Sequence, residues 1–299
     1  MSLLVVGTVA YDSIETPHGQ VTEETGGSAT YFSLAASRFT DVRLIASVGN
    51  DFPKERLDLF EGRSVDLTGL QVIEDGKTFR WSGRYQGDMN AAETLDTQLN
   101  VLATFEPKLP PGFEDSPFVF LANGAPRVQL DVLDQCKGRQ FVMCDTMNLW
   151  IEHERDGLLE VLRRVDGLIV NDEEIRSLTG ERNLIRAGTK ALELGPKVVI
   201  VKKGEHGAFL FSTYMFHALP AYPVTEVVDP TGAGDSFAGG LMGYLARTGQ
   251  VSIGTIKRAM AYGTVAASFT VASFGTEALA QARREDFDMR CQEFLHFVS

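Results

Sequence analysis

Residues 229–240 read DPTGAGDSFAGG, a tight glycine turn that leads directly into a helical pattern of apolar residues. The turn follows residues 224–228, an apolar segment that we predict to be a strand. Amide N–H groups in the first turn of a helix have no acceptor within the helix, and the helix dipole adds partial positive charge there. The sequence therefore predicts an anion site at the start of this helix, suited to a phosphate.

A carboxylate, Asp235, lies in the first turn of the same predicted helix. The helix dipole alone stabilises an acidic side chain at such a position, so a purely structural role stays open. The glycines at 232 and 234 cost chain entropy in a folded protein, which favours a functional turn over a structural one.

Short apolar runs recur along the chain and alternate with segments of helical periodicity. Unbroken runs of this kind are typical of strands that are covered on both faces, as in a parallel sheet. The alternation predicts a doubly wound, three-layer α/β/α fold with a mostly parallel central sheet. The runs are residues 3–6, 42–48, 118–122, 141–144, 168–170, 198–201 and 208–211.

Two segments, 11–25 and 70–95, break this alternation. Both are polar and rich in turn residues, and parts of them alternate between apolar and polar side chains. Half-buried strands with that pattern suit a small β-sheet inserted as a lid over a site. Two surface loops without function remain the alternative. We expect residues 1–299 to form a single domain that carries these inserted lid segments.

Charge and composition limit the partners of the chain. Its 299 residues include 28 basic and 40 acidic side chains, a formal net charge of −12, which argues against nucleic acid or an anionic membrane surface. No apolar stretch approaches the ~20 residues that span a bilayer, and the N-terminus lacks a basic signal region. The three cysteines have no metal-ligand spacing. We expect a soluble protein of the reducing cytoplasm.

Other motifs are absent or incomplete. The sequence has no G-x-x-x-x-G-K-[ST] loop, and no G-x-G-x-x-G follows residues 3–6, which argues against a P-loop or Rossmann cofactor site. Ala238 stands where the G-x-S-x-G elbow of a serine hydrolase needs glycine. His153-Glu154 lacks the second histidine of a zinc motif.

In several motifs, taken in order, the chain resembles the ribokinase/PfkB family of carbohydrate and nucleoside kinases. Residues 229–235 match its C-terminal signature D-[TP]-x-G-A-G-D. The other matching segments are Val6-Gly7 with Asp12, residues 26–29, residues 48–51, the N-x-x-E segment 171–174 and the glycine turn 203–208. The resemblance implies a ribokinase-like α/β fold with a small β-sheet lid, and an ATP-dependent transfer of the γ-phosphoryl group to a primary hydroxyl.

The resemblance also implies roles for individual residues. Asp235 would accept the proton of the hydroxyl, and the backbone around it would form the anion hole for the phosphoryl group. The expected catalytic residues are Asp235, Gly232, Ala233 and Gly234. The expected acceptor-binding residues are Asp12, Gly26, Gly27, Tyr31, Arg84 and Asn123. The expected nucleotide-binding residues are Asn171, Lys203, Gly204, Gly207, Thr231, Gly232, Gly234 and Thr264.

Metal ions follow from the same resemblance. Asn171 and Glu174 would act on Mg²⁺ through water, since magnesium keeps much of its hydration shell. Asp229 and Ser273 resemble the family's site for a monovalent cation, K⁺. For Glu174, an ordinary exposed helix carboxylate is the alternative.

Departures from the family pattern lie mostly on the acceptor side. Tyr31 stands where the family often has asparagine, and Ala10 stands where ribokinases carry an asparagine that touches the acceptor. Residues 145–148, DTMN, replace the usual D-x-N-x-R, and Lys202 replaces a common threonine before the glycine turn. These changes affect which substrate is bound more than which reaction is carried out.

The first functional hypothesis is therefore an ATP-dependent kinase of a sugar or sugar derivative, because polar residues of the lid such as Arg84 suit a polyhydroxylated acceptor. A nucleoside kinase is the alternative within the family, since Tyr31 and aromatic residues of the lid can stack on a base. A non-catalytic sugar-binding regulator is the hypothesis from a different class. A homodimer formed through the lid is a further hypothesis.

Overall fold

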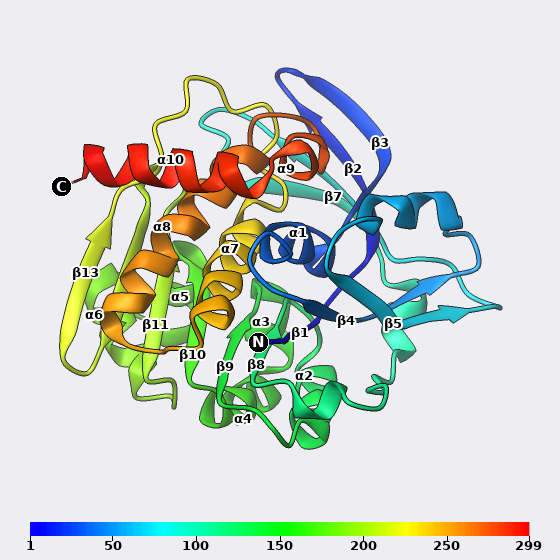
Figure 1. The fold of residues 1–299 in the computed structure, drawn as a ribbon, viewed down its shortest axis with the longest axis horizontal. Helices are drawn as coiled ribbons and strands as arrows, with labels where there is room; N and C mark the ends of the chain where they lie inside the picture. Colours follow the sequence, from blue (N-terminus) through cyan, green and yellow to red (C-terminus); the bar gives the residue numbers. More distant parts are fainter. Residues whose placement is uncertain (299) are drawn as a thin grey trace.

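Figure 1 shows a computed structural model of the protein, which describes residues 1–298. Within these residues the strands form a nine-stranded sheet in the order β13-β12-β11-β10-β9-β8-β1-β4-β5 and a four-stranded sheet in the order β3-β2-β6-β7. The strands are β1 Leu3–Val6, β2 Ala10–Thr16, β3 Gly19–Gly26, β4 Val42–Gly49, β5 Val65–Ile73, β6 Arg80–Tyr85, β7 Ala92–Gln98, β8 Phe118–Leu121, β9 Phe141–Asp145, β10 Gly167–Asn171, β11 Val198–Lys202, β12 Ala208–Ser212 and β13 Met215–Leu219.

Seven strands of the large sheet, from β11 to β5 in this order, are parallel, and β12 and β13 extend one edge as antiparallel strands. Each of the apolar runs noted in the sequence is a strand of this sheet. The runs in β1, β8 and β9 are buried at every residue, as expected for strands covered on both faces.

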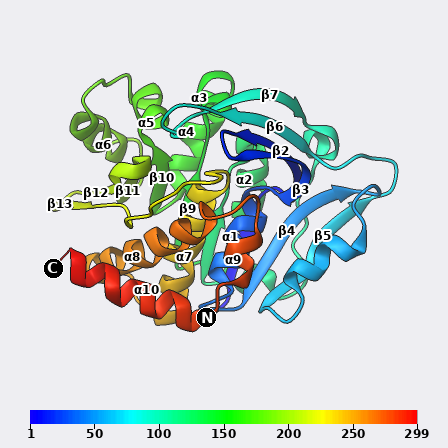
Figure 2. The same cartoon turned by 90° about the horizontal axis from the view of Figure 1, so that it is seen from above.

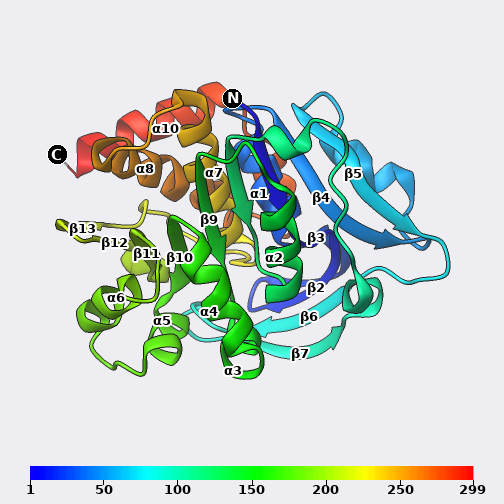
Figure 3. The same ribbon diagram turned by 90° about the horizontal axis from the view of Figure 1, so that it is seen from below.

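Helices cover both faces of the large sheet, as Figures 2 and 3 show from opposite sides. One apolar core lies between the sheet and α1, α7, α8 and α10, and a second lies between the sheet and α2, α4, α5 and α6. The helices are α1 Ser28–Ala36, α2 Pro126–Gln135, α3 Asn148–His153, α4 Arg155–Arg164, α5 Asp172–Thr179, α6 Leu184–Leu192, α7 Ala233–Thr248, α8 Ile253–Thr270, α9 Glu277–Gln281 and α10 Arg284–Phe297. Short 3₁₀ turns occur at Lys54–Phe60, Asn100–Thr104, Phe113–Asp115 and Gly204–His206.

The prediction of a strand at residues 224–228 is wrong. This segment is an irregular connection between β13 and α7, and Val224 is exposed. Its last residue, Val228, donates its amide to the carbonyl oxygen of Val271 at 2.8 Å, a single contact with the loop after α8. An apolar composition alone does not make a strand when no neighbouring strand is available to pair with it.

The small sheet contains both segments that interrupt the α/β alternation. Strand β2 pairs with β3 in antiparallel and with β6 in parallel orientation, and β7 completes the sheet beside β6. Residues 70–73 differ from the expectation, because they belong to β5 at the edge of the large sheet. The lid sheet therefore consists of residues 10–26 and 80–98.

The structure bears on membrane-spanning helices and on the three cysteines. In the described part of the chain, no helix is both long and apolar enough to cross a membrane. Cys136, Cys144 and Cys291 are buried free thiols, and burial raises the pKa of each.

The close packing of α7 on α8 depends on a glycine. A Cβ atom at Gly240 would lie 2.7 Å from the carbonyl oxygen of Tyr262, which is backbone of α8 and cannot rotate away. We expect Gly240→Ala to lower the free energy of unfolding by about 1–3 kcal/mol, measured by urea denaturation.

The matched control is Gly254→Ala in the first turn of α8. The nearest atom to a Cβ there is the Ser252 hydroxyl oxygen at 3.9 Å, so we expect stability to stay unchanged or to rise through helix propensity. Equal effects of the two substitutions would show that the α7–α8 approach does not require glycine.

Candidate functional site

The parallel strands bring polar residues together at one edge of the large sheet. Strands β9, β10 and β11 end at Asp145, Asn171 and Lys202, and Asn123 follows the end of β8. These four strands are neighbours and run in the same direction. Ligands of open α/β sheets commonly bind beyond the carboxyl ends of the strands, and the candidate site lies there.

The glycine turn before α7 has the geometry of a helix N-terminus. Gly232 is the N-cap residue with φ of 74°, a left-handed conformation that favours glycine. The Ala233 amide donates to the Pro230 carbonyl oxygen at 3.1 Å, which closes the turn. The Gly234 amide follows in the first helical turn, where N–H groups have no acceptor within the helix.

Asp235 projects from this turn into a group of other carboxylates. Burial, and to a lesser degree the carboxylate of Asp145, raise its pKa to about 7, although the ammonium of Lys202 opposes both effects. A carboxylate with a pKa near neutrality can both accept and hold a proton at physiological pH. This property fits the general base expected from the sequence.

Lys202 lies between three of these carboxylates. Its Nζ is 3.6 Å from Oδ2 of Asp145, and both side chains are largely buried. Burial lowers the pKa of Lys202, but the carboxylates of Asp145, Glu174 and Asp235 outweigh that effect and raise it. Lys202 therefore carries its positive charge within the site.

Glu174 and Asn171 form a capping box at the start of α5. The Asn171 side-chain oxygen accepts from the amide of Glu174 at 2.8 Å, and Oε2 of Glu174 accepts from the amide of Asn171 at 2.7 Å. Burial raises the pKa of Glu174 to about 8, and Lys202 opposes this shift. The alternative of an exposed helix carboxylate does not describe Glu174, which is buried.

The expected acceptor-binding residues Asp12, Gly26 and Gly27 lie together. Oδ2 of Asp12 accepts from the Gly27 amide at 3.2 Å, and a Cβ atom at Gly26 would lie 1.9 Å from the same oxygen. The absence of a side chain at Gly26 therefore lets the carboxylate contact the backbone. Burial raises the pKa of Asp12 to about 7.

Tyr31 lies on the other side of the glycine turn. A Cβ atom at Gly232 would be 2.3 Å from the Tyr31 ring, so the ring packs directly on that residue. The side chain is 1% exposed, and its hydroxyl has no hydrogen-bond partner among the described residues. The pKa of Tyr31 is raised by burial and by the carboxylates of Asp12 and Asp229.

Asn123 is joined to a tryptophan. Its Oδ1 accepts from Nε1 of Trp150 at 3.0 Å, and its amide nitrogen donates to the Met147 sulfur at 3.1 Å. The backbone oxygen of Asn123 accepts from the Ser28 hydroxyl at 3.5 Å, which connects this residue to the start of α1. Trp150 therefore belongs to the surroundings of the expected acceptor-binding residues.

The lid sheet presents different residues on its two faces. Asp12 and Ile14 pair in register with Trp81 and Gly83, and strand alternation places Tyr85 on the same face. The Thr231 hydroxyl donates to the Tyr85 oxygen at 3.4 Å, which joins this face to the glycine turn.

Arg84 belongs to the opposite face of the lid sheet. It forms ion pairs with Glu15 at 3.0 Å and Glu93 at 3.8 Å. The structure therefore does not bring Arg84 into the site as the sequence analysis expected.

The tip of the lid reaches the glycine turn after β11. The Asn90 amide nitrogen donates to the Glu205 carboxylate at 3.3 Å, and a Cβ atom at Gly204 would lie 2.2 Å from the Asn90 side-chain oxygen. Gly204 and Gly207 both have positive φ, and the Lys203 amide donates to the Gly207 carbonyl oxygen. The lid thus contacts both the acceptor side and the expected nucleotide side.

Two of the residues expected to bind the nucleotide, Lys203 and Thr264, have other surroundings in the structure. The Lys203 ammonium is 4.0 Å from the centre of the Phe209 ring, a cation–π contact on β12. Lys203 comes directly after the end of β11, and its ammonium contacts Phe209 whereas that of Lys202 pairs with Asp145. Thr264 is buried in the middle of α8 and shares no hydrogen bond with the glycine turn among residues 1–298.

Asp229 joins the signature turn to the loop after α8. Its two carboxylate oxygens accept from the amides of Thr231 and Gly275, each at 2.9 Å. Burial raises the pKa of Asp229. Ser273, in the same loop as Gly275, accepts from the Ala278 amide at 2.9 Å, which joins this loop to the first turn of α9.

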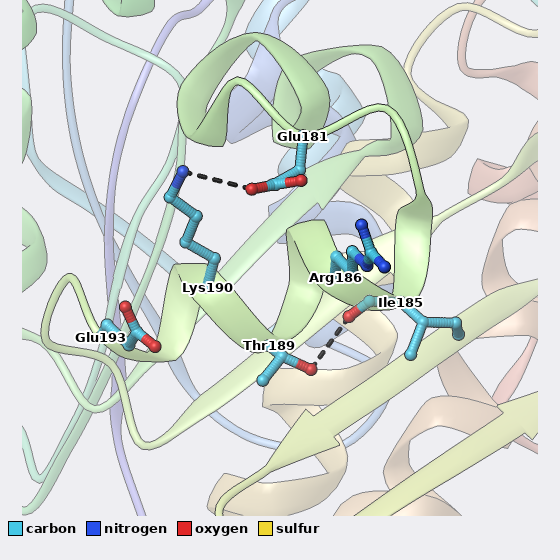
Figure 4. Close-up of a pocket in the computed structure, with 6 residues that line it drawn as sticks. All are labelled: Glu181, Ile185, Arg186, Thr189, Lys190 and Glu193. Carbon is cyan, nitrogen blue, oxygen red and sulfur yellow. Dashed lines mark hydrogen bonds and ion pairs between the residues drawn. The ribbon is translucent and has the colours of Figure 1, made fainter.

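A depression on the outer side of α6 is separate from this site (Figure 4). Its walls are side chains of α6 and of the loop before it, including the Lys190–Glu181 ion pair at 3.4 Å. None of the residues discussed above contributes to it.

Sequence reasoning missed the importance of Asp145, which it noted only as a departure from a motif. A signal was present, since Asp145 directly follows the buried run 141–144 and so ends a strand. Nothing in the local sequence showed that Lys202, two strands away, pairs with it.

Comparison with known proteins places the chain among kinases. The pattern of the pfkB family of carbohydrate kinases matches residues 2–283. A cytidine kinase of Thermococcus kodakarensis is 31% identical over 251 residues, which cover 82% of this chain and 88% of the relative. Among solved structures, the Methanocaldococcus jannaschii nucleoside kinase, described as a member of the ribokinase family, superposes with a TM-score of 0.78 at 20% identity over 98% of both chains.

A second similar structure was solved with ligands. It is an Escherichia coli protein provisionally described as a ribokinase II, in complex with ATP and Mg²⁺, with a TM-score of 0.79 at 20% identity over 98% of this chain and 99% of its own. These likenesses confirm the prediction of a ribokinase-like fold with a mostly parallel sheet and a small additional sheet.

The two tryptophans of the chain can report on this site. Trp81 shares the inner lid face with Asp12, and Trp150 is hydrogen-bonded to Asn123. We expect acceptor binding to change tryptophan emission in the Trp150→Phe variant, where Trp81 alone reports on the lid. Emission is measured during titration with acceptor.

Trp81→Phe is the complementary variant, in which the remaining signal comes from Trp150. An unchanged emission of the Trp150→Phe variant at saturating acceptor would show that the inner face of the lid does not meet the acceptor.

Proposed function

The chain belongs to the pfkB family of carbohydrate kinases, and on that premise we propose that its acceptor is a nucleoside, phosphorylated at the 5′-hydroxyl. The expected activity is confirmed at the level of the family: the protein is an ATP-dependent kinase of a sugar or a nucleoside. The nucleoside is our own choice between these two classes.

One observation carries the choice of acceptor. Asp12, a buried carboxylate that suits ribose hydroxyls, is the register partner of Trp81 on the neighbouring strand of the lid. The Trp81 indole lies over Gly83, and its Nε1 donates to the Thr94 hydroxyl of β7 at 3.3 Å. Ribose and base are joined directly in a nucleoside, so a carboxylate and an indole ring on one face of the lid match both parts. The cytidine kinase relative supports the same choice. A simple sugar, the first hypothesis from the sequence, would leave Trp81 without a stacking partner.

The proposed chemistry uses Asp235 as the base. The acceptor oxygen forms a bond to the γ-phosphorus, the bond from that phosphorus to the β–γ bridging oxygen breaks, and ADP leaves with the electron pair. The hydroxyl proton passes to the Asp235 carboxylate, whose raised pKa suits proton transfer near neutral pH. The backbone amides of Gly232 and Gly234 stabilise the charge on the phosphoryl oxygens.

The residues of the site fit a hydrated Mg²⁺ ion. Asp145, Glu174 and Asp235 are three acidic groups beside the single ammonium of Lys202, and the raised pKa of each shows that its ionised form is disfavoured there; a further cation would favour the ionised forms. No group of three or more acidic, histidine or cysteine side chains in the described part of the chain is arranged to bind a metal directly. Glu174 and Asn171 would hold the ion through water, and the ion would neutralise charge on the ATP phosphates.

Further parts of the proposal follow from the sequence analysis. We propose that Asp229 and Ser273, in two neighbouring loops, bind K⁺. We also propose that two copies of the chain form a homodimer through the lid sheet, and that the protein is cytoplasmic and forms a single domain. The exposed edge strand β7 supports the dimer, because unpaired strand edges readily pair with another chain. Potassium titration of activity and the mass of the protein in solution test these two points.

The Asp235→Asn variant tests two points: whether Asp235 is the general base, and whether its buried carboxylate lowers the stability of the folded protein. Burial raises the pKa of Asp235 from 3.8 to about 7, so between these values the folded protein holds a proton that the unfolded chain releases. Stability therefore falls as the pH rises across that range. We expect the variant to lose about 10²–10⁴-fold in kcat and to gain about 2–4 °C in Tm at pH 8. The gain in Tm should disappear near pH 4.

Asp41→Asn, at an exposed residue outside the site, is the control, and we expect it to leave kcat unchanged. A Tm of Asp235→Asn that is equal to the wild-type value at pH 8, with normal turnover, would exclude Asp235 as a buried base.

A panel of acceptors tests the substrate class. We expect nucleosides, with ATP and Mg²⁺, to release ADP with a higher kcat/KM than ribose, hexoses or sugar acids. Trp81→Ala should lower kcat/KM for nucleosides by about 5- to 150-fold, because base–aromatic stacking contributes about 1–3 kcal/mol. The variant should leave free sugars unaffected.

Tyr214→Ala serves as the control for loss of an aromatic side chain, since Tyr214 is 93% exposed at the β12–β13 turn. Preference for a sugar over every nucleoside would overturn the nucleoside proposal while leaving the kinase activity itself intact.

A further inference from the structure

The reaction scheme above gives no role to Lys202. Lys202 ends β11, and a Cβ atom placed on Gly234 would lie 2.7 Å from its Nζ. The ammonium therefore lies directly beside the glycine turn whose amides face the transferred phosphoryl group. A buried ammonium at that position is an electrostatic element of the site as well as a partner for Asp145.

The surroundings of Lys202 keep it charged and oriented. Asp145 holds the ammonium at 3.6 Å, and Glu174 and Asp235 lie close enough to stabilise its charge. The side chain retains 18% exposure, so a ligand can reach it. A structural ion pair needs only one carboxylate for each lysine, whereas three carboxyl groups surround Lys202. Removal of the lysine would leave the buried carboxyl groups without a balancing positive charge.

The sequence supplies an independent reason for a cation here. Residues 145–148 read DTMN, and no arginine stands at 149, where the D-x-N-x-R pattern has one. The aspartate of this segment, Asp145, pairs with Lys202. Phosphoryl transfer needs such compensation, because negative charge spreads over the γ-phosphoryl oxygens in the transition state.

We propose that Lys202 is a catalytic residue that donates hydrogen bonds to the γ-phosphoryl oxygens of ATP, and that Asp145 is the positioning residue that aims it. The inference rests on the proposed kinase function and extends it, independently of which acceptor is bound. Lys202 stays protonated throughout and takes part in no bond making or breaking. Its charge offsets the carboxylates when the anionic phosphates enter.

The first experiment measures turnover and nucleotide affinity of Lys202→Met. We expect kcat to fall by about 10²–10³-fold, as for the loss of one oxyanion-stabilising donor. Affinity for a non-hydrolysable ATP analogue should fall by about 10- to 100-fold, as for a charged hydrogen bond, while affinity for ADP changes little. Calorimetry without acceptor gives these affinities, so a wrong acceptor class would leave this result intact.

The control is Lys197→Met, at the residue directly before the first residue of β11. Lys197 also forms an ion pair with an aspartate, Asp166 at 2.8 Å, but it lies on the surface. Its substitution should leave kcat and both nucleotide affinities unchanged.

A pair of further variants separates catalysis from stability. Asp145→Asn leaves the ammonium in place, so we expect it to keep most of the affinity for the ATP analogue. The double variant Asp145→Asn/Lys202→Met removes both charges together and avoids an unpaired buried ion, so it remains testable if Lys202→Met alone does not fold. The double variant should show the full loss of affinity for the analogue.

Two outcomes would overturn the proposal. Equal losses of affinity for ADP and for the ATP analogue in the double variant would show that Lys202 does not act on the γ-phosphoryl group. Equal losses of kcat and Tm in Asp145→Asn and Lys202→Met, with analogue affinity preserved in both, would show that the pair is a structural ion pair.

Discussion

The burial of carboxylates around Lys202, at the carboxyl edge of a parallel sheet, is the constraint on which the site depends. Taking charges out of water is costly unless they are paired, and here the pKa values of Asp235 and Glu174 rise to about 7 and about 8 as a result. The cost is tolerable because the surrounding strands and helices form two large apolar cores. Magnesium and the phosphates of ATP would complete the balance of charge.

The same edge of the sheet explains how distant segments cooperate. Residues from the ends of β9, β10 and β11 meet the glycine turn before α7 because neighbouring parallel strands end side by side. The lid sheet adds a third group of residues, with Tyr85 at the turn and Asn90 at the glycine loop after β11. One lid therefore contacts both the glycine turn before α7 and the loop after β11, an arrangement that suits the exclusion of water during phosphoryl transfer.

Much of the fold could be predicted from local pattern. The seven apolar runs are strands, the turn at 232–234 begins α7, and the two polar segments contribute the lid sheet. The strand expected at 224–228 is absent, and residues 70–73 joined β5 instead of the lid. Both errors concern pairing, because whether an extended segment becomes a strand depends on a partner that the local sequence does not name.

The sequence by itself determined the order of the motifs, the anion-binding turn and the identity of Asp235 as the candidate base. Those features are local, since a glycine turn and a helix start are defined by adjacent residues. Only the tertiary structure decided what each side chain contacts: Lys202 pairs with Asp145 whereas Lys203 contacts Phe209. Similarly, Trp81 is the register partner of Asp12 whereas Arg84 pairs with Glu15. Strand alternation divides residues into two faces, but the packing of the sheets determines which face meets the ligand.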